Sequence, residues 1–403
     1  MDSYRNSDAT PPVMVGSPPP AEWRIPRLNW DRPPWNRWAF QHIREMLPTA
    51  AIRRAARPSP LPETAGRLDD LTYSGADGQQ TSFAEMLEET YTDAMLVWKD
   101  GQILHESYHN GMDAQTPHLL QSVSKSITAG ASASLIEEGL LDPAAPITDY
   151  LPELARTAWN GATLQQVMDM TTGVRFDETY HHRDSDAGKM DVAAGWKLPP
   201  PDFDTSDWPR SIWDQILGLT IADAEHGARF HYRSIETDIL AHAMQRVTGQ
   251  PLARIISERL WQPLGCAEDA SITIDSAGYG LACGGISATL RDMARFGIAL
   301  LNDGQIDGRQ VIPRAFVEDT RSGPHGLFDD YSRETLPNGC YRNQFWIEDA
   351  QRGRFMCRGV FGQMVYVATD ARVVAVKFST YPEFLSRPFF LSAMAAFHAV
   401  AGP

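Results

Sequence analysis

The sequence has few cysteines, few positive charges and no long apolar segment. Its four cysteines, Cys266, Cys283, Cys340 and Cys357, include no C-x-x-C pair, so the pattern predicts free thiols rather than a zinc ribbon or a disulfide framework. Only 36 basic residues stand against 51 acidic ones, and the formal net charge of -15 disfavours nucleic acid and anionic membrane surfaces as partners. No apolar run approaches the ~20 residues of a membrane span.

Residues 1–36 lack both helical periodicity and the pattern of a secretory signal. No basic patch precedes an apolar run there, so we expect a cytoplasmic protein. The segment is rich in proline, which predicts an arm draped over the folded body, with Trp30, Trp35 and Trp38 as anchors.

Strand patterns lie toward both ends of the chain, with helical patterns between them. Asp100-Gly101 separates two alternating segments, a strong signal for a β-hairpin, and residues 364–380 read as two strands about a turn. Residues 122–139 predict a helix of small side chains, and residues 150–290 are mostly helical and loop-rich. The pattern predicts an α/β fold in which distant segments close one sheet and a helical lobe is inserted.

Residues 105–109 read His-Glu-Ser-Tyr-His, which matches the zinc-protease string H-E-x-x-H. Two histidines four apart meet on one face of a helix, but the Asp-Gly turn places this segment in a strand. There His105 and His109 are separated by about 13 Å of backbone, at ~3.3 Å per residue. Ligands of one zinc ion keep their donor atoms within about 4 Å of one another. A zinc hydrolase is therefore a disfavoured interpretation.

Ser122-Val123-Ser124-Lys125 forms an S-x-x-K motif at the start of the predicted helix. A spacing of three places Ser122 and Lys125 side by side, and the helix N-terminus stabilises negative charge that develops there. A buried lysine that loses its proton activates such a serine as a nucleophile. The motif is short, so a solvated pair on a helix surface is the alternative.

Tyr232 lies two residues before Ser234, a predicted helix N-cap. A phenol at a helix start beside a lysine can cycle protons, although a half-buried packing tyrosine would give the same pattern. The glycine-rich segment 278–297 has Cys283 in place of the third glycine of G-x-G-x-x-G, so no dinucleotide cofactor is expected. The absence of G-x-S-x-G disfavours the α/β-hydrolase fold.

Residues 122–154, the Tyr232 segment and residues 284–304 together resemble the serine β-lactamase and penicillin-recognising superfamily. Within it, four segments resemble the 6-aminohexanoate-dimer hydrolases, which act on nylon oligomers: PPWNRWAFQHIREMLP, HLLQSVSKS, DETY and TDARVVAVKFS. The resemblance runs from about residue 30 to the C-terminus. It implies a β-lactamase-like fold, with an antiparallel sheet, flanking helices and an inserted helical lobe.

The resemblance also implies roles for individual residues. Ser122 matches the nucleophile, Lys125 its proton partner and Tyr232 the tyrosine that protonates the leaving group. Tyr180 matches a loop tyrosine that closes over the substrate, and Asp191 a carboxylate that pairs with the substrate's amino group. Without the resemblance, Asp191 would be read as a surface acid and Tyr180 as a packing aromatic.

Further positions concern the pocket and the oxyanion. Trp346 matches an aromatic residue of the pocket, although alone it would be read as a core aromatic. Cys283 stands where the nylon-oligomer enzyme has a polar pocket residue. The resemblance implies an oxyanion hole formed by the N–H groups of Ser122 and Val360, the latter beside Gly359.

Two motifs of the superfamily are altered in this chain. Residues 232–234 read Tyr-Arg-Ser instead of Y-x-N, and Cys-Arg-Gly at 357–359 stands where K-T-G is usual. The cation that contacts a β-lactam carboxylate is therefore changed or absent, and we expect neither β-lactamase activity nor a role in peptidoglycan chemistry.

We expect a serine hydrolase that cleaves linear amides, 6-aminohexanoate dimer and oligomers first, through an acyl-enzyme, with esterase activity and no cofactor or metal. Whether Lys125 or Tyr232 is the base is left open. The alternatives are a carboxylesterase of the same fold acting on small esters and a non-catalytic, penicillin-binding-like protein. The expected partner is a small amide or ester, and a homodimer is left open. Residues 37–121 and 290–403 would form the α/β lobe, and residues 122–289 the helical lobe.

Overall fold

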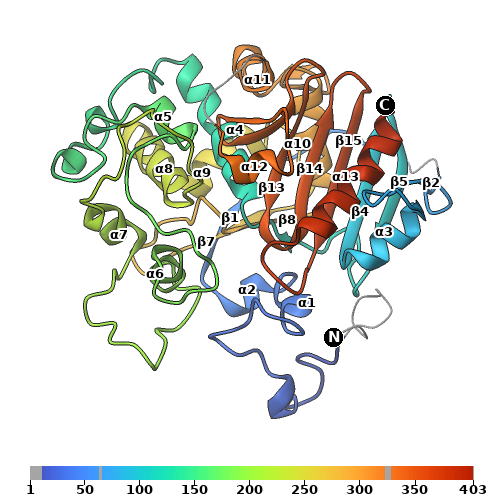
Figure 1. The fold of residues 1–403 in the computed structure, drawn as a ribbon, viewed down its shortest axis with the longest axis horizontal. Coiled ribbons are helices and arrows are strands. Elements are labelled where there is room, and N and C mark those ends of the chain that lie inside the picture. Colours follow the sequence, from blue (N-terminus) through green and yellow to red (C-terminus); the bar gives the residue numbers. More distant parts are fainter. Residues whose placement is uncertain (1–10, 63–65, 323–327, 403) are drawn as a thin grey trace.

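A computed structural model describes residues 11–62, 66–322 and 328–402, and Figure 1 shows their arrangement. Strands from both ends of the chain form a large sheet, and a group of helices from the middle of the chain lies beside it. The predicted α/β class is confirmed. Among these residues, no helix is long and apolar enough to cross a membrane.

The larger sheet has seven antiparallel strands in the order β11-β12-β13-β14-β15-β4-β5. Their bounds are β4 Thr92–Lys99, β5 Gln102–Tyr108, β11 Cys340–Arg342, β12 Phe345–Asp349, β13 Arg354–Gly359, β14 Gln363–Ala368 and β15 Val373–Ser379. Asp100 and Gly101 have φ values of 47° and 90°, which confirms the predicted turn between β4 and β5. β15 pairs with β4, so strands from the two ends of the chain meet inside the sheet.

Side chains alternate between the two faces of this sheet, as the pleat of a strand requires. In β4, Met95 and Val97 pack in the core on the side of α3 (Phe83–Glu89) and α13 (Arg387–Ala401). Leu96 belongs to the core on the opposite side, where α4 (Val123–Glu137) and α10 (Leu290–Leu301) pack. The sheet is therefore buried on both faces.

A second, four-stranded antiparallel sheet has the order β1-β7-β8-β6. Its strands are β1 Thr49–Ile52, β6 His118–Leu119, β7 Ala270–Thr273 and β8 Ile286–Ala288. β7 and β8 lie within residues 122–289, which the sequence suggested as a helical lobe, and they pair with strands from residues 37–121. The two segments therefore share a sheet.

Apart from α8, the remaining elements are short. The helices are α1 Asn36–Ala39, α2 Ile43–Met46, α5 Leu164–Met168, α6 Asp186–Ala193, α7 Ile212–Gly218, α8 Ile235–Thr248, α9 Leu252–Ile256, α11 Arg314–Arg321 and α12 Asp330–Arg333. Two small hairpins pair β2 Thr72–Ser74 with β3 Gln80–Ser82, and β9 Gln305–Ile306 with β10 Arg309–Gln310.

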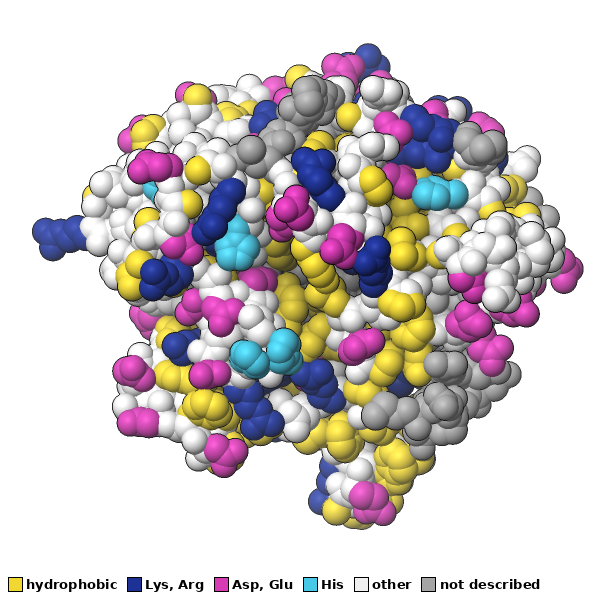
Figure 2. All heavy atoms as spheres, in the orientation of Figure 1, with side chains coloured by type: hydrophobic (Ala, Val, Ile, Leu, Met, Phe, Trp, Pro, Cys, Tyr) yellow, Lys and Arg dark blue, Asp and Glu magenta, His cyan; other side chains and the backbone are white. Residues whose placement is uncertain are grey.

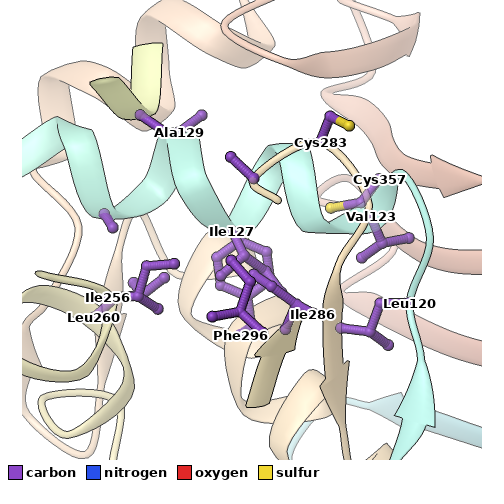
Figure 3. Packing of buried hydrophobic residues seen from close by; sticks show 14 of the residues in the cluster. Leu120, Val123, Ile127, Ala129, Ile256, Leu260, Cys283, Ile286, Phe296 and Cys357 are labelled. Carbon is purple, nitrogen blue, oxygen red and sulfur yellow. The ribbon is translucent and has the colours of Figure 1, made fainter. Parts of the chain in front are cut away.

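Helix α4 is buried along most of its length, and Figure 3 shows its packing. Ile127 lies among Ile286 and Phe296, which come from β8 and α10. A Cβ added at Gly130 would lie only 3.2 Å from the Phe296 ring, so the small residues of α4 allow α10 to approach closely. The S-x-x-K motif therefore stands at the end of a rigidly packed helix.

The N-terminal arm is fixed to the body by Trp30, which is fully buried. Its indole Nε1 donates to Trp196 O at 2.7 Å, and its ring contacts the Trp196 ring edge to face. This confirms Trp30 as an anchor; Trp35 and Trp38 are half-buried. The anchor brings the next residue, Asp31, against the segment after α6.

The H-E-x-x-H segment lies on strand β5 and the residue that follows it, as the hairpin predicted. Nε2 of His105 and Nε2 of His109 lie 2.9 Å and 3.0 Å from Ser107 Oγ. The two rings are thus closer than the 13 Å backbone spacing suggests, because alternate side chains of a strand share one face. Burial lowers the pKa of His105 to about 4, so its ring is neutral.

Candidate active site

Ser122 is the N-cap of α4 and lies directly after Gln121, whose φ is 49°. A residue other than glycine with a positive φ has a strained backbone, and such strain concentrates at functional sites. Lys125, one turn along α4, is almost fully buried and donates from Nζ to Ser122 Oγ at 2.9 Å. The spacing of three therefore produces the expected contact.

Lys125 Nζ has two further partners, Ser234 Oγ at 3.1 Å and Cys283 O at 2.7 Å. Burial lowers the pKa of Lys125, but the interactions with Tyr232 and Glu178 outweigh burial and hold this pKa above its usual value. The resting lysine is therefore an ammonium with three acceptors for its three N–H groups.

Tyr232 completes this group from the loop before α8. Its ring centroid lies 5.2 Å from Lys125 Nζ. Burial raises the pKa of Tyr232, while the Lys125 charge and a hydrogen bond with Ser122 oppose that shift. Trp346 stacks on the Tyr232 ring, with centroids 5.4 Å apart and planes inclined by 24°. Trp346 thus packs against the Tyr232 ring, and its contact with substrate stays a prediction.

The predicted oxyanion donors lie where β13 passes the start of α4. A Cβ added at Gly359 would lie 2.8 Å from Leu120 O and 3.1 Å from Ser122 N, so only glycine allows this approach. Val360 follows at once, and both Ser122 and Val360 line the same cavity. Phe361, the next residue, has a φ of 60°. Both predicted donors thus adjoin a residue in the left-handed region.

We expect Gly359→Ala to lower kcat on every substrate by about 10²-fold or more, the cost of losing one oxyanion donor. The methyl group would push β13 away from Leu120 O and displace the Val360 N–H. Steady-state kinetics measure the loss. Gly218→Ala, at an exposed position of α7 with open space around it, is the matched control. Full activity of Gly359→Ala would contradict the assignment of the Val360 N–H group as an oxyanion donor.

The cavity beside Ser122 has a mostly apolar wall. Figure 2 shows a hollow lined with hydrophobic side chains near the middle of the molecule, with charged and histidine side chains around it. The apolar lining comes from Ala187, Met190, Trp196, Leu281, Phe361 and Phe384. Four of the predicted residues, Tyr180, Asp191, Cys283 and Val360, also line the cavity with Ser122. A linear apolar chain attached to the reacting carbonyl would fit such walls.

The carboxylates of Asp31 and Asp191 line this cavity, and Lys197 lies next to them. Lys197 Nζ lies 2.9 Å from Asp191 Oδ2 and 2.8 Å from Asp31 Oδ2. Among the described residues, the buried Oδ1 of Asp31 accepts no hydrogen bond. Burial raises the pKa of Asp191, while the Lys197 ammonium opposes that shift. The lysine compensates one of the two negative charges, which leaves an excess negative charge in this trio.

The sequence did not indicate Asp31 or Glu178 as site residues. Glu178 Oε1 accepts from Tyr180 OH at 2.8 Å and also from Ser234 Oγ. Its Oε2 accepts from Ser234 N at 2.8 Å, at the start of α8. Glu178 stands two residues before Tyr180 in the DETY segment, and that proximity was the signal available. Asp31 had none, because the arm carries no motif.

Cys283 contributes its backbone and its thiol in different directions. The carbonyl accepts from Lys125, and the thiol contacts the buried Asp238. Burial and this carboxyl raise the pKa of the Cys283 thiol, so it stays protonated. All four cysteines are buried, and Cys266, Cys283 and Cys357 are free thiols, as the sequence predicted.

The model of the beta-lactamase family matches residues 82–389. The chain is 36% identical, over 357 residues and 88% of either chain, to 6-aminohexanoate-dimer hydrolase from Paenarthrobacter ureafaciens. It is 26% identical over 224 residues, 50% of this chain and 54% of the relative, to esterase EstB from Burkholderia gladioli.

Among solved structures, the fold is similar to a protein from Bacillus anthracis provisionally assigned as a 6-aminohexanoate-dimer hydrolase. The TM-score is 0.84 at 30% identity, and the match covers 95% of this chain and 98% of the other. These similarities confirm the expected β-lactamase-like fold and the relation to 6-aminohexanoate-dimer hydrolase. With the family model spanning most of the sequence, the chain belongs to the beta-lactamase family and is a serine hydrolase.

Proposed function

We propose that this protein hydrolyses linear amides of ω-amino acids, 6-aminohexanoate dimer and oligomers first, through an acyl-enzyme on Ser122. The observation that carries the proposal is the contact of Ser122 Oγ with Lys125 Nζ, at 2.9 Å, beside an apolar cavity that also holds a carboxylate. The 36% sequence identity to a 6-aminohexanoate-dimer hydrolase supports the same substrate class.

In acylation, Ser122 Oγ bonds to the amide carbon while its proton passes to the group formed by Lys125 and Tyr232. The N–H groups of Ser122 and Val360 bind the developing oxyanion. The C–N bond then breaks as the leaving nitrogen takes a proton from Tyr232 or Tyr180. Water attacks the acyl-enzyme, the bond to Oγ breaks, and Ser122 regains its proton.

Substrate selection would depend on Asp191. A six-carbon acyl chain with a terminal ammonium would run along the apolar wall and reach the carboxylates of Asp191 and Asp31. The excess negative charge of these two groups around Lys197 favours a cation at that place.

A carboxylesterase acting on small esters is the second candidate. Lys197 contacts both Asp191 and Asp31, so each carboxylate keeps a contact with a cation when the acyl group in the cavity is uncharged. The similarity to EstB supports this reading. Arg358, the cation nearest to the usual K-T-G position, instead lies 3.9 Å over the Phe390 ring, which supports the expectation that β-lactams are poor substrates.

We expect Asp191→Asn to lower kcat/KM for 6-aminohexanoate dimer by roughly 5- to 150-fold, because a charged hydrogen bond contributes about 1–3 kcal/mol. The amide should change far more than p-nitrophenyl acetate, which has no amino group. Asp202→Asn, at an exposed position, is the control. Equal losses on both substrates would make Asp191 structural, and a wild type that cleaves only the ester would establish the esterase.

A further inference from the structure

Glu178 lies between two groups that exchange protons with the reacting atoms. Its carboxylate accepts hydrogen bonds from Tyr180 OH and Ser234 Oγ, and Ser234 Oγ in turn accepts from Lys125 Nζ at 3.1 Å. Lys125 contacts the nucleophile at 2.9 Å. The contacts form one unbroken series, in the order Ser122, Lys125, Ser234, Glu178, Tyr180.

The proposed mechanism leaves a proton unaccounted for at Lys125. The neighbouring acidic groups hold the pKa of this lysine above its usual value, so its resting form is an ammonium. An ammonium cannot accept the proton of Ser122. With Lys125 as the base, one of its three protons has to leave before or during the attack, and the leaving nitrogen has to receive one at the other side of the substrate.

We propose that Glu178 is a proton-relay residue that carries the spare proton of Lys125, through Ser234, to Tyr180. This inference rests on the proposed acyl-enzyme function and adds a residue to it. Glu178 is a positioning and relay group, because among the described residues its carboxylate accepts from Ser234 and Tyr180 and acts through them on the substrate.

A proton leaves Lys125 Nζ for Ser234 Oγ while the Ser234 hydroxyl proton moves to Glu178 Oε1, which leaves a neutral amine. Ser122 then gives its proton to that amine and bonds to the carbonyl carbon. When the C–N bond breaks, Tyr180 OH protonates the leaving nitrogen, and protonated Glu178 restores the Tyr180 proton. The net transfer is one proton from Ser122 to the leaving amine of the substrate. Lys125, Ser234, Glu178 and Tyr180 all return to their starting forms.

The surroundings of Glu178 hold its carboxylate in a fixed position. Ser234 N, at the N-terminus of the 14-residue helix α8, donates to Oε2 at 2.8 Å and holds the group in place. This leaves Oε1 for both hydroxyl partners. The side chain is half-buried and lines the cavity, so the path from Ser234 to Tyr180 borders the site where the leaving group forms.

The test compares leaving groups that need a proton with one that does not. Glu178→Gln keeps the shape of the side chain and an accepting oxygen, but it cannot pass a proton. For 6-aminohexanoate dimer and for ethyl acetate we expect kcat to fall by about 10²-fold, as for other losses of general acid–base catalysis, with KM within a few-fold. p-Nitrophenyl acetate needs Glu178 only to take the spare proton of Lys125, because its phenolate leaves unprotonated. The dimer and ethyl acetate need Glu178 for both transfers, so the loss on p-nitrophenyl acetate should be at least tenfold smaller.

A second pair of variants interrupts the path at its other link. Ser234→Ala removes the hydroxyl and should reproduce the leaving-group dependence, whereas Ser234→Thr keeps a hydroxyl and should recover much of the loss. Asp184→Asn, on the same loop and exposed, removes an equal charge outside the path and is the control. The Ser234 pair keeps the test valid if Glu178→Gln does not fold, which thermal unfolding by circular dichroism would show.

The outcomes separate the relay from the proposed function. Equal losses on all three substrates, or no loss on the dimer and ethyl acetate, would overturn the relay. Failure of the wild type on the dimer would contradict the amide proposal alone, because the two esters still compare a poor with a good leaving group. A Tyr180→Phe variant should lose as much as Glu178→Gln, and the double variant no more than either, since groups of one path are not additive.

Discussion

Ser122→Ala is expected to lower kcat by ~10³-fold or more on esters and amides alike, as removal of the nucleophile does in other serine hydrolases. The reason is geometric. Ser234, the other serine on the cavity wall, is held by Glu178 and Lys125 and does not stand at the oxyanion position. Burst-phase and steady-state kinetics measure the loss.

The matched control is Ser134→Ala, near the far end of the same helix and half-buried. It should keep wild-type kinetics. A fluorophosphonate probe gives an independent check, because it labels an activated serine covalently and peptide mapping locates it. Label on Ser234, or activity above a few per cent in Ser122→Ala, would contradict the assignment of the nucleophile.

The second large effect is expected at Lys125. Both Lys125→Met and Lys125→Arg should lower kcat/KM by about 10³-fold, within the range of general acid–base catalysis. Arginine keeps the positive charge but does not lose its proton, so its inactivity would show that Lys125 must become neutral. Lys189→Met, a half-buried lysine on α6, is the control.

An active Lys125→Arg variant would give the opposite answer. It would mean that the cation only stabilises a Tyr232 phenolate, which would then be the base. Each variant needs a stability measurement, because Ser234 Oγ and Cys283 O lose a buried donor. One unsatisfied buried group costs about 1–3 kcal/mol, so Tm should fall for methionine while the fold is kept.

The sequence predicted local features of the fold well. The Asp100-Gly101 turn and the helix from residue 123 are set by short-range preferences, namely positive φ at the turn and small residues on the helix. It did not predict that β7 pairs with β1 and β8 with β6, since the partners in each pair lie more than 150 residues apart and nothing local encodes the pairing. The prediction from sequence therefore missed the strands that lie within residues 122–289.

In the candidate site, too, the sequence predicted the local contact and missed the long-range ones. Ser122 and Lys125 are three residues apart, so helical geometry alone places them in contact. Glu178 and Asp31 act through partners far away in the chain, Ser234 and Lys197, and a carboxylate in a loop looks the same in sequence whether it is solvated or buried. The pairing of Lys197 with Asp191 was missed for the same reason and alters the charge presented to a substrate.

The pairing of β15 with β4 bears on how the chain is made on the ribosome. Lys99 pairs with Val373 and Thr92 with Ser379, so β4 lacks one neighbour until the last part of the chain has emerged. By then every proposed catalytic residue has been synthesised, but the apolar edge of β4 is still open, and open edges promote aggregation of nascent chains. A chain released just after residue 362 would therefore contain the whole active site and yet be expected to precipitate rather than hydrolyse anything.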